Sequence, residues 1–489
     1  MNNNYILGID QSTQGTKALL FDREGKIVGK SNLSHDQIIN DLGWVEHNPE
    51  QIYDNVKAVV HTLLAKTDIG MDKIAAIGIT NQRETVVVWD RNTGTPIYNA
   101  IVWQCARGAA ICNRLEQYQD MIHEHTGLHL SPYFSAAKIA WVLENIPGAK
   151  EKSEDGSLCY GTIDSWLLYK LTGGKSYKTD FSNASRTQLF NIRELRWDEE
   201  ICRLFGINPS CLAEVCDSNA DFGDTDFDGS FEKKVSIRSM IGDSHGALFG
   251  QRCIHEGMIK ATYGTGSSIM MNIGYKPVFS NKGIVTSLAW SIDHKVEYVL
   301  EGNINYSGAV ISWLKNDIKL IQHDGETEAL AFQANSMDKT YLVPAFSGLG
   351  APHWRSEAKA LICGMTRLTG QAEIVRAALE SIAYQITDIV SLMSEEAQIA
   401  VKELRVDGGP TKNRYLMQFQ SDILNIPVLV PEMEELSVIG AVLMAGIAMG
   451  FFEQEHILAG SHTQRFQPAM EADERDEKYQ GWKSALELV

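Results

Sequence analysis

The sequence has no excess of basic residues. Lys and Arg total 44 against 62 Asp and Glu, which gives a formal net charge of −18. Nucleic acids and anionic membrane surfaces are bound through clustered Lys and Arg that neutralise phosphates. We therefore expect no nucleic-acid partner. The negative charge of an anionic substrate would have to be neutralised at the binding site itself, by backbone amides, a few cations or a metal.

Paired cysteines and long apolar runs are missing as well. The eight cysteines include no CxxC pair and no regular spacing, so buried, reduced thiols are expected in place of a zinc site or a disulfide framework. The apolar run Val438 to Met449 is too short and too broken by glycine to span a bilayer. The chain opens on Met1-Asn2-Asn3-Asn4 with no basic or long apolar segment. We expect a cytoplasmic protein without membrane insertion.

The length and composition favour a two-domain soluble enzyme. The chain has 489 residues, of which 44% are apolar and 22% charged. This is more than one hydrophobic core usually serves, so two domains of roughly 200 to 250 residues are expected. A ligand cleft between them would be typical.

The order of the apolar patterns predicts two α/β units that share one plan. Runs at 5–9, 18–21 and 27–29 read as an antiparallel meander, followed by an amphipathic helix over 49–66 and a buried strand over 74–79. A second meander over 258–273 precedes a long helix over 372–393 and a strand over 404–407. We place the domain boundary near residue 250, giving domains 1–250 and 251–489, and we expect surface loops at 220–229 and 322–328.

Each meander contains a turn of small residues that could hold a phosphate. The turns are residues 10–17, DQSTQGTK, and residues 264–268, GTGSS. Small residues let the backbone approach a phosphate, and amides and hydroxyls donate to its oxygens. The first turn is not a Walker motif, because six residues separate Gly8 from Gly15 and Thr16 precedes Lys17. For a single such turn, a hairpin without any ligand remains an alternative.

Longer segments resemble one family throughout the chain. The spaced patterns that start at Tyr133 and at Ala360 look like the two signatures of the FGGY carbohydrate kinases. The other matching segments are GWVEHNPEQI, IAAIGITNQRET, GTPIYNAIVWQC, TDFSNASRTQLFNI, ATYGTG, VPAFSGLGAP, ALESIAYQ and LRVDGGPTKNRYLMQFQSDIL.

The resemblance implies a fold, a cofactor and a nucleotide site. The fold would be two actin-like, ribonuclease-H-like α/β domains with ATP in the cleft between them. Asp10 would face the Mg²⁺ of Mg-ATP through water, although a strand-end aspartate can also cap its own turn. The nucleotide would be bound by Thr13, Gln14, Lys17, Thr265, Gly308, Ser312, Gly409 and Asn413.

The resemblance also implies the chemistry and the acceptor site. Asp243 would take the proton of a primary hydroxyl while the γ-phosphoryl group is transferred. Arg83 and Glu84 would hold the hydroxyls of a small polyol, with glycerol as the first substrate to test. From the residues alone, Asp243 could be a satisfied loop carboxylate, and Arg83 with Glu84 a surface pair. The resemblance further implies that the substrate contacts would be completed by Trp103, Tyr133, Ser244 and Ser268.

Several positions depart from the members of the family that phosphorylate glycerol. Ser244 replaces a glutamine, Ser268 a phenylalanine and Ala106 an arginine, so a wider and more polar pocket is expected. A kinase for a tetritol, a pentitol or a ketopentose is therefore an alternative.

Other departures concern the nucleotide and regulation. Lys17 stands in place of an arginine and Ser312 in place of a glutamine. The segment 227–237 lacks the Gly-Gly-Arg pattern associated with fructose-1,6-bisphosphate inhibition. A non-catalytic, nucleotide-dependent switch is an alternative of another class. The resemblance implies a homodimer or homotetramer.

Overall fold

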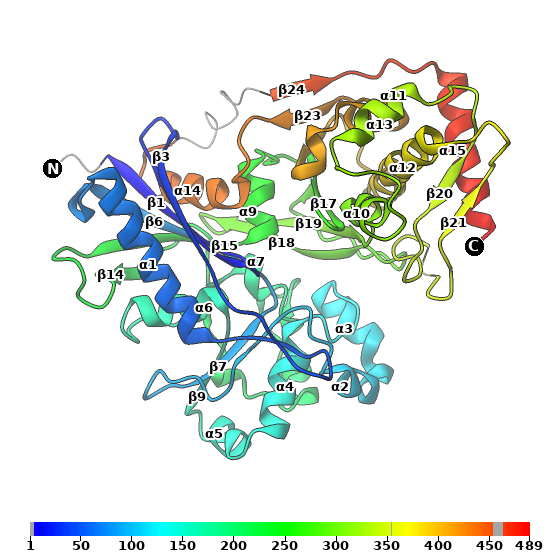
Figure 1. Ribbon diagram of the computed structural model, residues 1–489. Helices are drawn as coiled ribbons and strands as arrows, with labels where there is room; N and C mark the ends of the chain where they lie inside the picture. Colours follow the sequence, from blue (N-terminus) through cyan, green and yellow to red (C-terminus); the bar gives the residue numbers. More distant parts are fainter. Residues whose placement is uncertain (1–3, 354, 453–462) are drawn as a thin grey trace.

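The computed structural model describes residues 4–353, 355–452 and 463–489, which form two α/β halves (Figure 1). The first half is built on a six-stranded sheet in the order β14-β15-β6-β1-β2-β3. The first three strands pair antiparallel in sequence, which confirms the predicted meander. Strand β6 joins β1 in parallel, and β15 joins β6 in parallel. The strands are β1 (Tyr5–Gln11), β2 (Gly15–Phe21), β3 (Ile27–Ser34), β6 (Ile74–Asn81), β14 (Gly223–Thr225) and β15 (Val235–Gly242).

Helix α1 (Pro49–Thr67) packs on this sheet, as its apolar pattern predicts. Asn48 accepts hydrogen bonds from the backbone N–H groups of Glu50 and Gln51, and Pro49 lies in the first turn, where no N–H is needed. The buried face of α1 packs in one apolar cluster with residues of β1, β6 and α6 (Ile163–Leu171). Its members in α1 include Ile52, Val56, Val59, Val60 and Leu63.

A smaller sheet extends the first half. Its order is β4-β5-β8-β7-β9, and its strands are β4 (Ile38–Ile39), β5 (Val45–His47), β8 (Ala100–Ile101), β7 (Val86–Asp90) and β9 (Leu158–Thr162). The helices in this part are α2 (Ala109–Arg114), α3 (Gln119–Thr126), α4 (Ser135–Asn145), α5 (Ala149–Glu154), α7 (Phe181–Ala184) and α8 (Glu199–Leu204). Residues 82–85 connect β6 to β7, so Arg83 and Glu84 lie where the two sheets meet.

The second half repeats the plan around a seven-stranded sheet in the order β18-β19-β17-β16-β22-β23-β24. The antiparallel pair β16 and β17 confirms the second predicted meander. Strands β18 and β19, which the sequence did not predict, extend it by antiparallel pairing. The strands are β16 (Ile259–Tyr263), β17 (Ser267–Gly274), β18 (Val285–Ile292), β19 (Lys295–Ile304), β22 (Leu404–Asp407), β23 (Val428–Pro431) and β24 (Thr463–Phe466).

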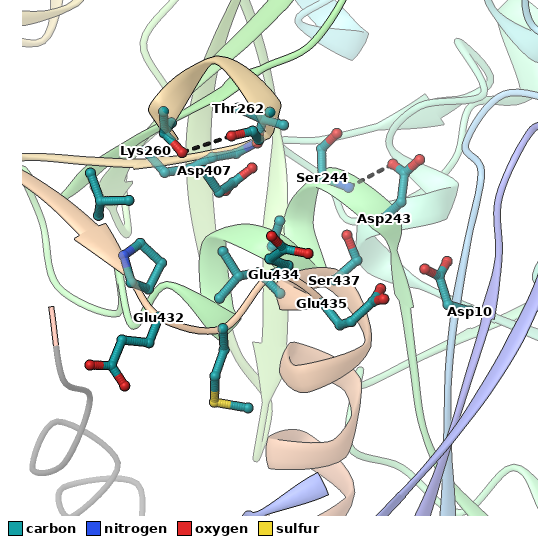
Figure 2. Close-up of a pocket in the computed structure, with 18 of the residues that line it drawn as sticks. Asp10, Asp243, Ser244, Lys260, Thr262, Asp407, Glu432, Glu434, Glu435 and Ser437 are labelled. Carbon is teal, nitrogen blue, oxygen red and sulfur yellow. Dashed lines mark hydrogen bonds between the residues drawn. The ribbon is translucent and has the colours of Figure 1, made fainter. Parts of the chain in front are cut away.

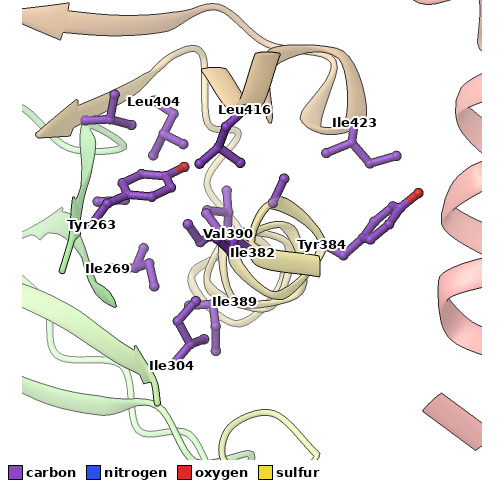
Figure 3. Close-up of a cluster of buried hydrophobic side chains, with 14 of the residues drawn as sticks. Tyr263, Ile269, Ile304, Ile382, Tyr384, Ile389, Val390, Leu404, Leu416 and Ile423 are labelled. Atoms are coloured by element: carbon purple, nitrogen blue, oxygen red, sulfur yellow. The ribbon is translucent and has the colours of Figure 1, made fainter. Parts of the chain in front are cut away.

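The predicted long helix, α12 (Gln371–Ala397), forms the core of the second half with this sheet. Figure 3 shows Ile382, Ile389 and Val390 of α12 beside Tyr263, Ile269 and Ile304 of the strands. The helices around it are α10 (Gly308–Asn316), α11 (Glu326–Gln333), α13 (Arg414–Leu424) and α15 (Ala472–Glu487). Short strand pairs complete the fold: β10 (Lys178–Asp180) with β13 (Glu214–Cys216), β11 (Phe190–Asn191) with β12 (Arg196–Trp197), and β20 (Tyr341–Val343) with β21 (Leu361–Cys363).

Helix α14 (Leu436–Ala448) belongs to the second half of the chain but packs on the sheet of the first half, beside α9 (Asp243–Gly250) (Figure 1). Glycines permit the contact. A Cβ atom on Gly440 of α14 would lie 2.0 Å from the carbonyl oxygen of Gly246 in α9, and one on Gly78 of β6 would lie 2.6 Å from that of Ala441. The backbones of α14, α9 and β6 therefore touch directly.

Two segments expected as loops contain regular structure. Residues 223–225 form the edge strand β14, in which Asp224 is exposed and Thr225 is buried. Helix α11 begins at Glu326, inside the segment 322–328, and Glu326 and Glu328 in its first turn favour a helix N-terminus.

The cysteines behave as expected. All eight are free, and six are buried, with Cys216 and Cys363 partly exposed. Of the helices in the described ranges, none combines the length and the apolar character needed to cross a bilayer. Residues 1–3, part of the opening segment, lie outside the described residues.

Candidate active site

Asp10 lies near the end of β1, directly opposite Lys17 of β2. Ser12 closes the turn between them, because its N–H and its hydroxyl both donate to the carbonyl of Gly15, at 2.9 and 3.0 Å. The Asp10 side chain is buried, and its Oδ1 has no hydrogen-bond partner among the described residues. Burial raises the pKa of Asp10 to about 7; the charge of Lys17 opposes this shift, and the charges of Asp243 and Glu435 add to it.

Asp10 borders a cavity of about 660 Å³, called here the cleft cavity, which both halves of the chain line (Figure 2). Its walls carry six carboxylates, from Asp10, Asp243, Asp407, Glu432, Glu434 and Glu435. Two of its lysines are paired, Lys17 with Glu435 at 2.7 Å and Lys412 with Glu434 at 2.9 Å. The third, Lys260, donates to the hydroxyl of Thr262 at 3.0 Å. A polyanion bound here would need additional positive charge.

A second cavity, of about 730 Å³, adjoins the first and is called here the nucleotide cavity. Gly409 and Lys412 line both. Five of the residues predicted to bind nucleotide line it together: Thr265, Gly308, Ser312, Gly409 and Asn413. Apolar side chains form another part of its wall: Ile311, Leu379, Ile382 and Leu416. Apolar walls with a few polar groups are typical of sites that hold a planar base.

The turn after β16 reaches the nucleotide cavity because two backbone segments touch. Ser307 N–H donates to the carbonyl of Thr265 at 2.9 Å, and Gly308 N–H donates to that of Gly264 at 2.8 Å. A Cβ atom on Gly308 would lie 2.7 Å from the Gly264 oxygen, so this position requires glycine. The arrangement places Thr265 and Gly308 side by side at the cavity.

Asp243 is the first residue of α9 and follows β15 directly. The backbone N–H of Ser244 donates to its Oδ1 at 2.6 Å, and the Nε of Arg83 lies 3.1 Å from the same oxygen. The side chain is 35% exposed, so the carboxylate remains accessible from the cavity that it lines.

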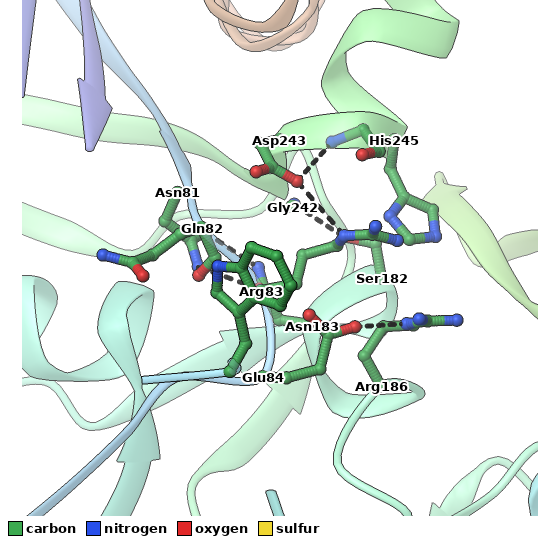
Figure 4. A network of polar contacts seen from close by, with 12 residues as sticks. Asn81, Gln82, Arg83, Glu84, Ser182, Asn183, Arg186, Gly242, Asp243 and His245 are labelled. Atoms are coloured by element: carbon green, nitrogen blue, oxygen red, sulfur yellow. Dashed lines mark hydrogen bonds and ion pairs between the residues drawn. The ribbon is translucent and has the colours of Figure 1, made fainter. Parts of the chain in front are cut away.

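Arg83 belongs to a buried network of alternating charges (Figure 4). Its Nη1 and Nη2 donate to the two oxygens of Glu301, at 2.8 and 3.1 Å. Arg186 donates from Nε to Glu84 at 2.6 Å, and its Nη1 lies 3.1 Å from Glu301. Burial alone would raise the pKa of Glu301, but the charges of Arg186 and Arg83 hold it well below its usual value. The two hydrogen bonds to Glu301 therefore fix the guanidinium of Arg83, and its Nε lies beside Asp243.

Glu84 and the predicted aromatic residues lie around this network. Glu84 has a positive φ of 61°, an uncommon conformation that functional sites often contain. The rings of Trp103 and Tyr133 meet edge to face, with their centroids 5.5 Å apart. Trp103 donates from Nε1 to the hydroxyl of Thr13 at 2.9 Å, so the first turn and the aromatic pair are connected. Burial raises the pKa of the Tyr133 phenol, which keeps it a hydrogen-bond donor.

The remaining predicted residues have different environments. Ser244 lines the cleft cavity, whereas Gln14 is exposed and lines neither cavity described above. The Ser268 hydroxyl is buried and has no hydrogen-bond partner among the described residues. Ala106 is exposed.

Sequence reasoning missed the buried residues whose ion pairs fix Arg83 and Glu84, chiefly Arg186 and Glu301. Lys260, Asp407 and Glu435, which line the cleft cavity, were missed as well. A charge inside an apolar strand, as in VEYVLEGNI around Glu301, is a usable signal, because such a charge must be paired when buried. The partner could not be found, since Arg83 is 218 residues away in the sequence.

The residues at Asp10 fit a nucleotide-borne magnesium ion. No group of three or more potential ligands from His, Cys, Asp and Glu is arranged for a metal within the described part of the chain. Mg²⁺ carried by phosphates needs only one or two carboxylates and keeps several waters. The buried, unpartnered Oδ1 of Asp10 could supply one.

Comparison with known proteins connects this site to one family. The N-terminal domain model of the FGGY family of carbohydrate kinases matches residues 5–250, and the C-terminal domain model matches residues 259–449. A glycerol kinase from Bacillus velezensis is 47% identical over 486 residues, covering 99% of this chain and 98% of that protein. One from Carboxydothermus hydrogenoformans is 47% identical over 490 residues, with the same coverage.

Solved structures of kinases have the same fold. Plasmodium falciparum glycerol kinase with ADP superimposes with a TM-score of 0.94 at 38% identity, covering 99% of this chain and 98% of that one. A ligand-bound xylulose kinase from Lactobacillus acidophilus has a TM-score of 0.88 at 21% identity, covering 99% and 97%, and shares the fold.

Proposed function

Because this chain belongs to the FGGY family of carbohydrate kinases, we propose that it transfers the γ-phosphoryl group of ATP to a primary hydroxyl of glycerol. It is an ATP-dependent kinase with the two actin-like, ribonuclease-H-like domains of that family. Relatives named glycerol kinases, 47% identical over nearly the whole chain, support glycerol as the acceptor. The product would be glycerol 3-phosphate.

The observation that carries the proposal is the contact of Asp243 with Arg83, at 3.1 Å, at the edge of the cleft cavity. Both contacts of Asp243 use Oδ1, so Oδ2 is the oxygen available to an acceptor hydroxyl. Arg83 keeps donors beyond those used by Glu301, because each terminal nitrogen carries two hydrogens. A polyol held between Arg83 and Glu84 would therefore present a hydroxyl to Asp243.

The reaction follows from this placement. The acceptor oxygen forms a bond to the γ-phosphorus as the bond to the bridging oxygen of ADP breaks, and ADP leaves with that electron pair. Asp243 Oδ2 takes the hydroxyl proton. Thr13 and Thr265, from the two small-residue turns, would bind phosphate oxygens together with their backbone amides, as would Lys17 with its charge.

Magnesium, when bound beside Asp10, supplies positive charge to the phosphates. Asp10 itself contributes an oxygen that has no other partner among the described residues. The nucleotide would lie in the nucleotide cavity, where Gly308, Ser312, Gly409 and Asn413 meet. Gln14, which lines neither cavity, stays a predicted nucleotide contact. A cytoplasmic location and a dimeric or tetrameric assembly stay predictions.

The experiment that tests this function measures ADP release with Mg-ATP in the presence and absence of glycerol. We expect release that depends on glycerol, with saturation in both substrates. ATP hydrolysis that is unaffected by any polyol would favour the nucleotide-dependent switch and would contradict the proposed function.

A further inference from the structure

Lys138 is a buried cation that the proposed reaction does not use. It is the fourth residue of α4, and it is fully buried. Its Nζ donates to three successive backbone carbonyls, those of Pro132 at 2.7 Å, of Tyr133, and of Phe134 at 3.1 Å. An ammonium has three hydrogens, so each carbonyl receives one of them and the cation is fully hydrogen-bonded.

The place of this cation is unfavourable for stability. Burial removes the ammonium from water, and the N-terminal turns of a helix carry positive partial charge. Burial lowers the pKa of Lys138 to about 7, and the charge of Glu84 opposes this shift. The other titratable or charged groups around Nζ are Cys105, Cys112 and Arg107. Such a placement points to a role in fixing the segment to which the three carbonyls belong.

Tyr133 is the central residue of that segment. Its carbonyl accepts from Lys138, and its N–H donates to the hydroxyl of Ser131 at 3.2 Å, so both of its backbone polar groups are held. Its ring meets that of Trp103 with the centroids 5.5 Å apart and that of Phe134 at 5.2 Å, both edge to face. The backbone contacts therefore fix a residue that is predicted to bind the acceptor.

The two residues after Tyr133 contact the charged network of the acceptor site. The guanidinium carbon of Arg186 lies 5.2 Å from the centroid of the Phe134 ring. The hydroxyl of Ser135 donates to the backbone carbonyl of Glu84 at 3.1 Å. Arg186 and Glu84 are themselves paired, so the segment contacts both members of this ion pair. A displacement of the segment would therefore move Tyr133 and Glu84 together.

We propose that Lys138 is a positioning residue for the acceptor, whose ammonium holds residues 132–134, and through them Tyr133 and Glu84, where a bound polyol needs them. This inference rests on the proposed kinase function and adds no contact with the substrate. The charged form is the active one. A neutral amine has two hydrogens and a lone pair, and the lone pair would face one of the three carbonyl oxygens. Acceptor binding should therefore weaken when Lys138 loses its proton.

The test measures kcat and the KM values for glycerol and ATP in the wild type, Lys138→Met and Lys150→Met. Methionine is unbranched and flexible like lysine but has no N–H donor. Lys150, an exposed residue of α5, is the matched control. We expect the glycerol KM of Lys138→Met to rise about fivefold or more with the ATP KM within about twofold, because only the acceptor side is disturbed. All three constants of Lys150→Met should stay within about twofold of wild type.

The dependence on pH is a second readout, which a merely structural lysine would not affect. Because the pKa of Lys138 is lowered to about 7, most of its charge is lost between pH 6 and pH 8.5. With saturating Mg-ATP at each pH, the wild-type glycerol KM should rise about threefold or more over this range. The glycerol KM of Lys138→Met should rise less than the wild-type value, since the titrating group is gone.

Three results would overturn the inference while the kinase function stands. They are a smaller rise in the glycerol KM of folded Lys138→Met, an ATP KM raised as much as the glycerol KM, and the same pH dependence of the glycerol KM in both proteins. If Lys138→Met does not fold, the wild-type profile decides, and a glycerol KM that does not rise from pH 6 to pH 8.5 overturns the inference. A wild-type protein that phosphorylates no acceptor contradicts the proposed function and this inference with it.

Discussion

Asp243 owes its position to separate parts of the chain. Strand β15 and helix α9 set its backbone, the N–H of Ser244 holds Oδ1, and Arg83 from the link between two sheets approaches the same oxygen. Glu301 of the second half holds Arg83 in turn. A proton acceptor fixed in this way needs little reorganisation when an acceptor hydroxyl binds.

Replacing this carboxylate by an amide is the sharpest change at the residue scale. Asp243→Asn keeps an oxygen that can accept from Ser244 and Arg83 but removes the base. We expect kcat to fall by about 100- to 10,000-fold, with the affinities for ATP and glycerol within a few fold of wild type. Steady-state kinetics and equilibrium binding test this. An unchanged kcat would remove Asp243 from the chemistry.

Asp10 gives a pH-dependent prediction for stability. The pKa of Asp10 is about 7 in the folded protein against an ordinary value of 3.8 in the unfolded chain, so its contribution to stability is present below pH 4 and is lost as pH rises towards 7. Asp10→Asn should therefore be more stable than wild type at pH 8, by on the order of 2 to 4 kcal/mol, and nearly equal to it at pH 4. Urea unfolding without magnesium measures this. A stability difference that does not change with pH would show that burial does not raise the pKa of Asp10.

Asp10, Asp243 and the nucleotide residues could be predicted because the segments around them resemble the FGGY family, and their roles stay predictions. The sequence did not reveal Arg186 and Glu301, since their roles depend on pairing across long separations. It also did not reveal that Ser268 lies beside Asn303, which requires the register of β17 with β19. The resemblance identified candidate residues along the chain, but contacts between distant residues could be found only in the structure.

At the scale of elements, helices α9 and α14 place Asp243 through a glycine contact. Gly246 and Gly250 of α9 face α14 so closely that Cβ atoms there would lie 2.6 and 2.2 Å from backbone oxygens of α14. The contact fixes α9 against the first sheet. Because Asp243 begins α9, the position of the base depends on how closely α14 packs.

Gly440→Ala should therefore impair both stability and catalysis. The new methyl group would lie 2.0 Å from the Gly246 oxygen, which forces the helices apart at a cost of about 3 kcal/mol or more. We expect a lower denaturation midpoint and a kcat reduced at least tenfold. Gly370→Ala, where the nearest atom would be 3.5 Å away on a side chain, is the control; it changes only the N-cap of α12, so it should lose about 1 kcal/mol at most and keep its kcat. Equal behaviour of the two variants would contradict this account.

The strands and helices with clear periodicity were predicted well, including α1, α12 and both meanders. The apolar run at 438–449 was recognised as too short for a membrane, but its packing on the other half of the chain was not foreseen. Such packing depends on shape at Gly8, Gly78 and Gly246, which no hydrophobic pattern encodes. The boundary near residue 250 stays a prediction.

At the scale of the whole molecule, the two halves share an apolar cluster. Ile6, Leu19 and Ile241 of the first half pack with Val438 and Val442 of α14. The cleft cavity lies beside this cluster and takes residues from both halves. The first half is therefore incomplete without the second.

A fragment of residues 1–250 should not fold as an independent unit. Without α14, the apolar face that it covers would be exposed, so we expect aggregation or strong binding of a hydrophobic dye. Mixing with a fragment of residues 251–489 during refolding should restore dye exclusion. The full chain is the control. A monomeric 1–250 fragment that unfolds cooperatively and binds no dye would contradict the shared core.

The most direct test of the central claim is ³¹P NMR of the products formed from Mg-ATP and glycerol by the wild-type protein and by Asp243→Asn. The account predicts stoichiometric glycerol 3-phosphate and ADP with the wild type, and almost none with the variant over the same time. Inorganic phosphate in place of glycerol 3-phosphate, or equal product from the two proteins, would contradict it.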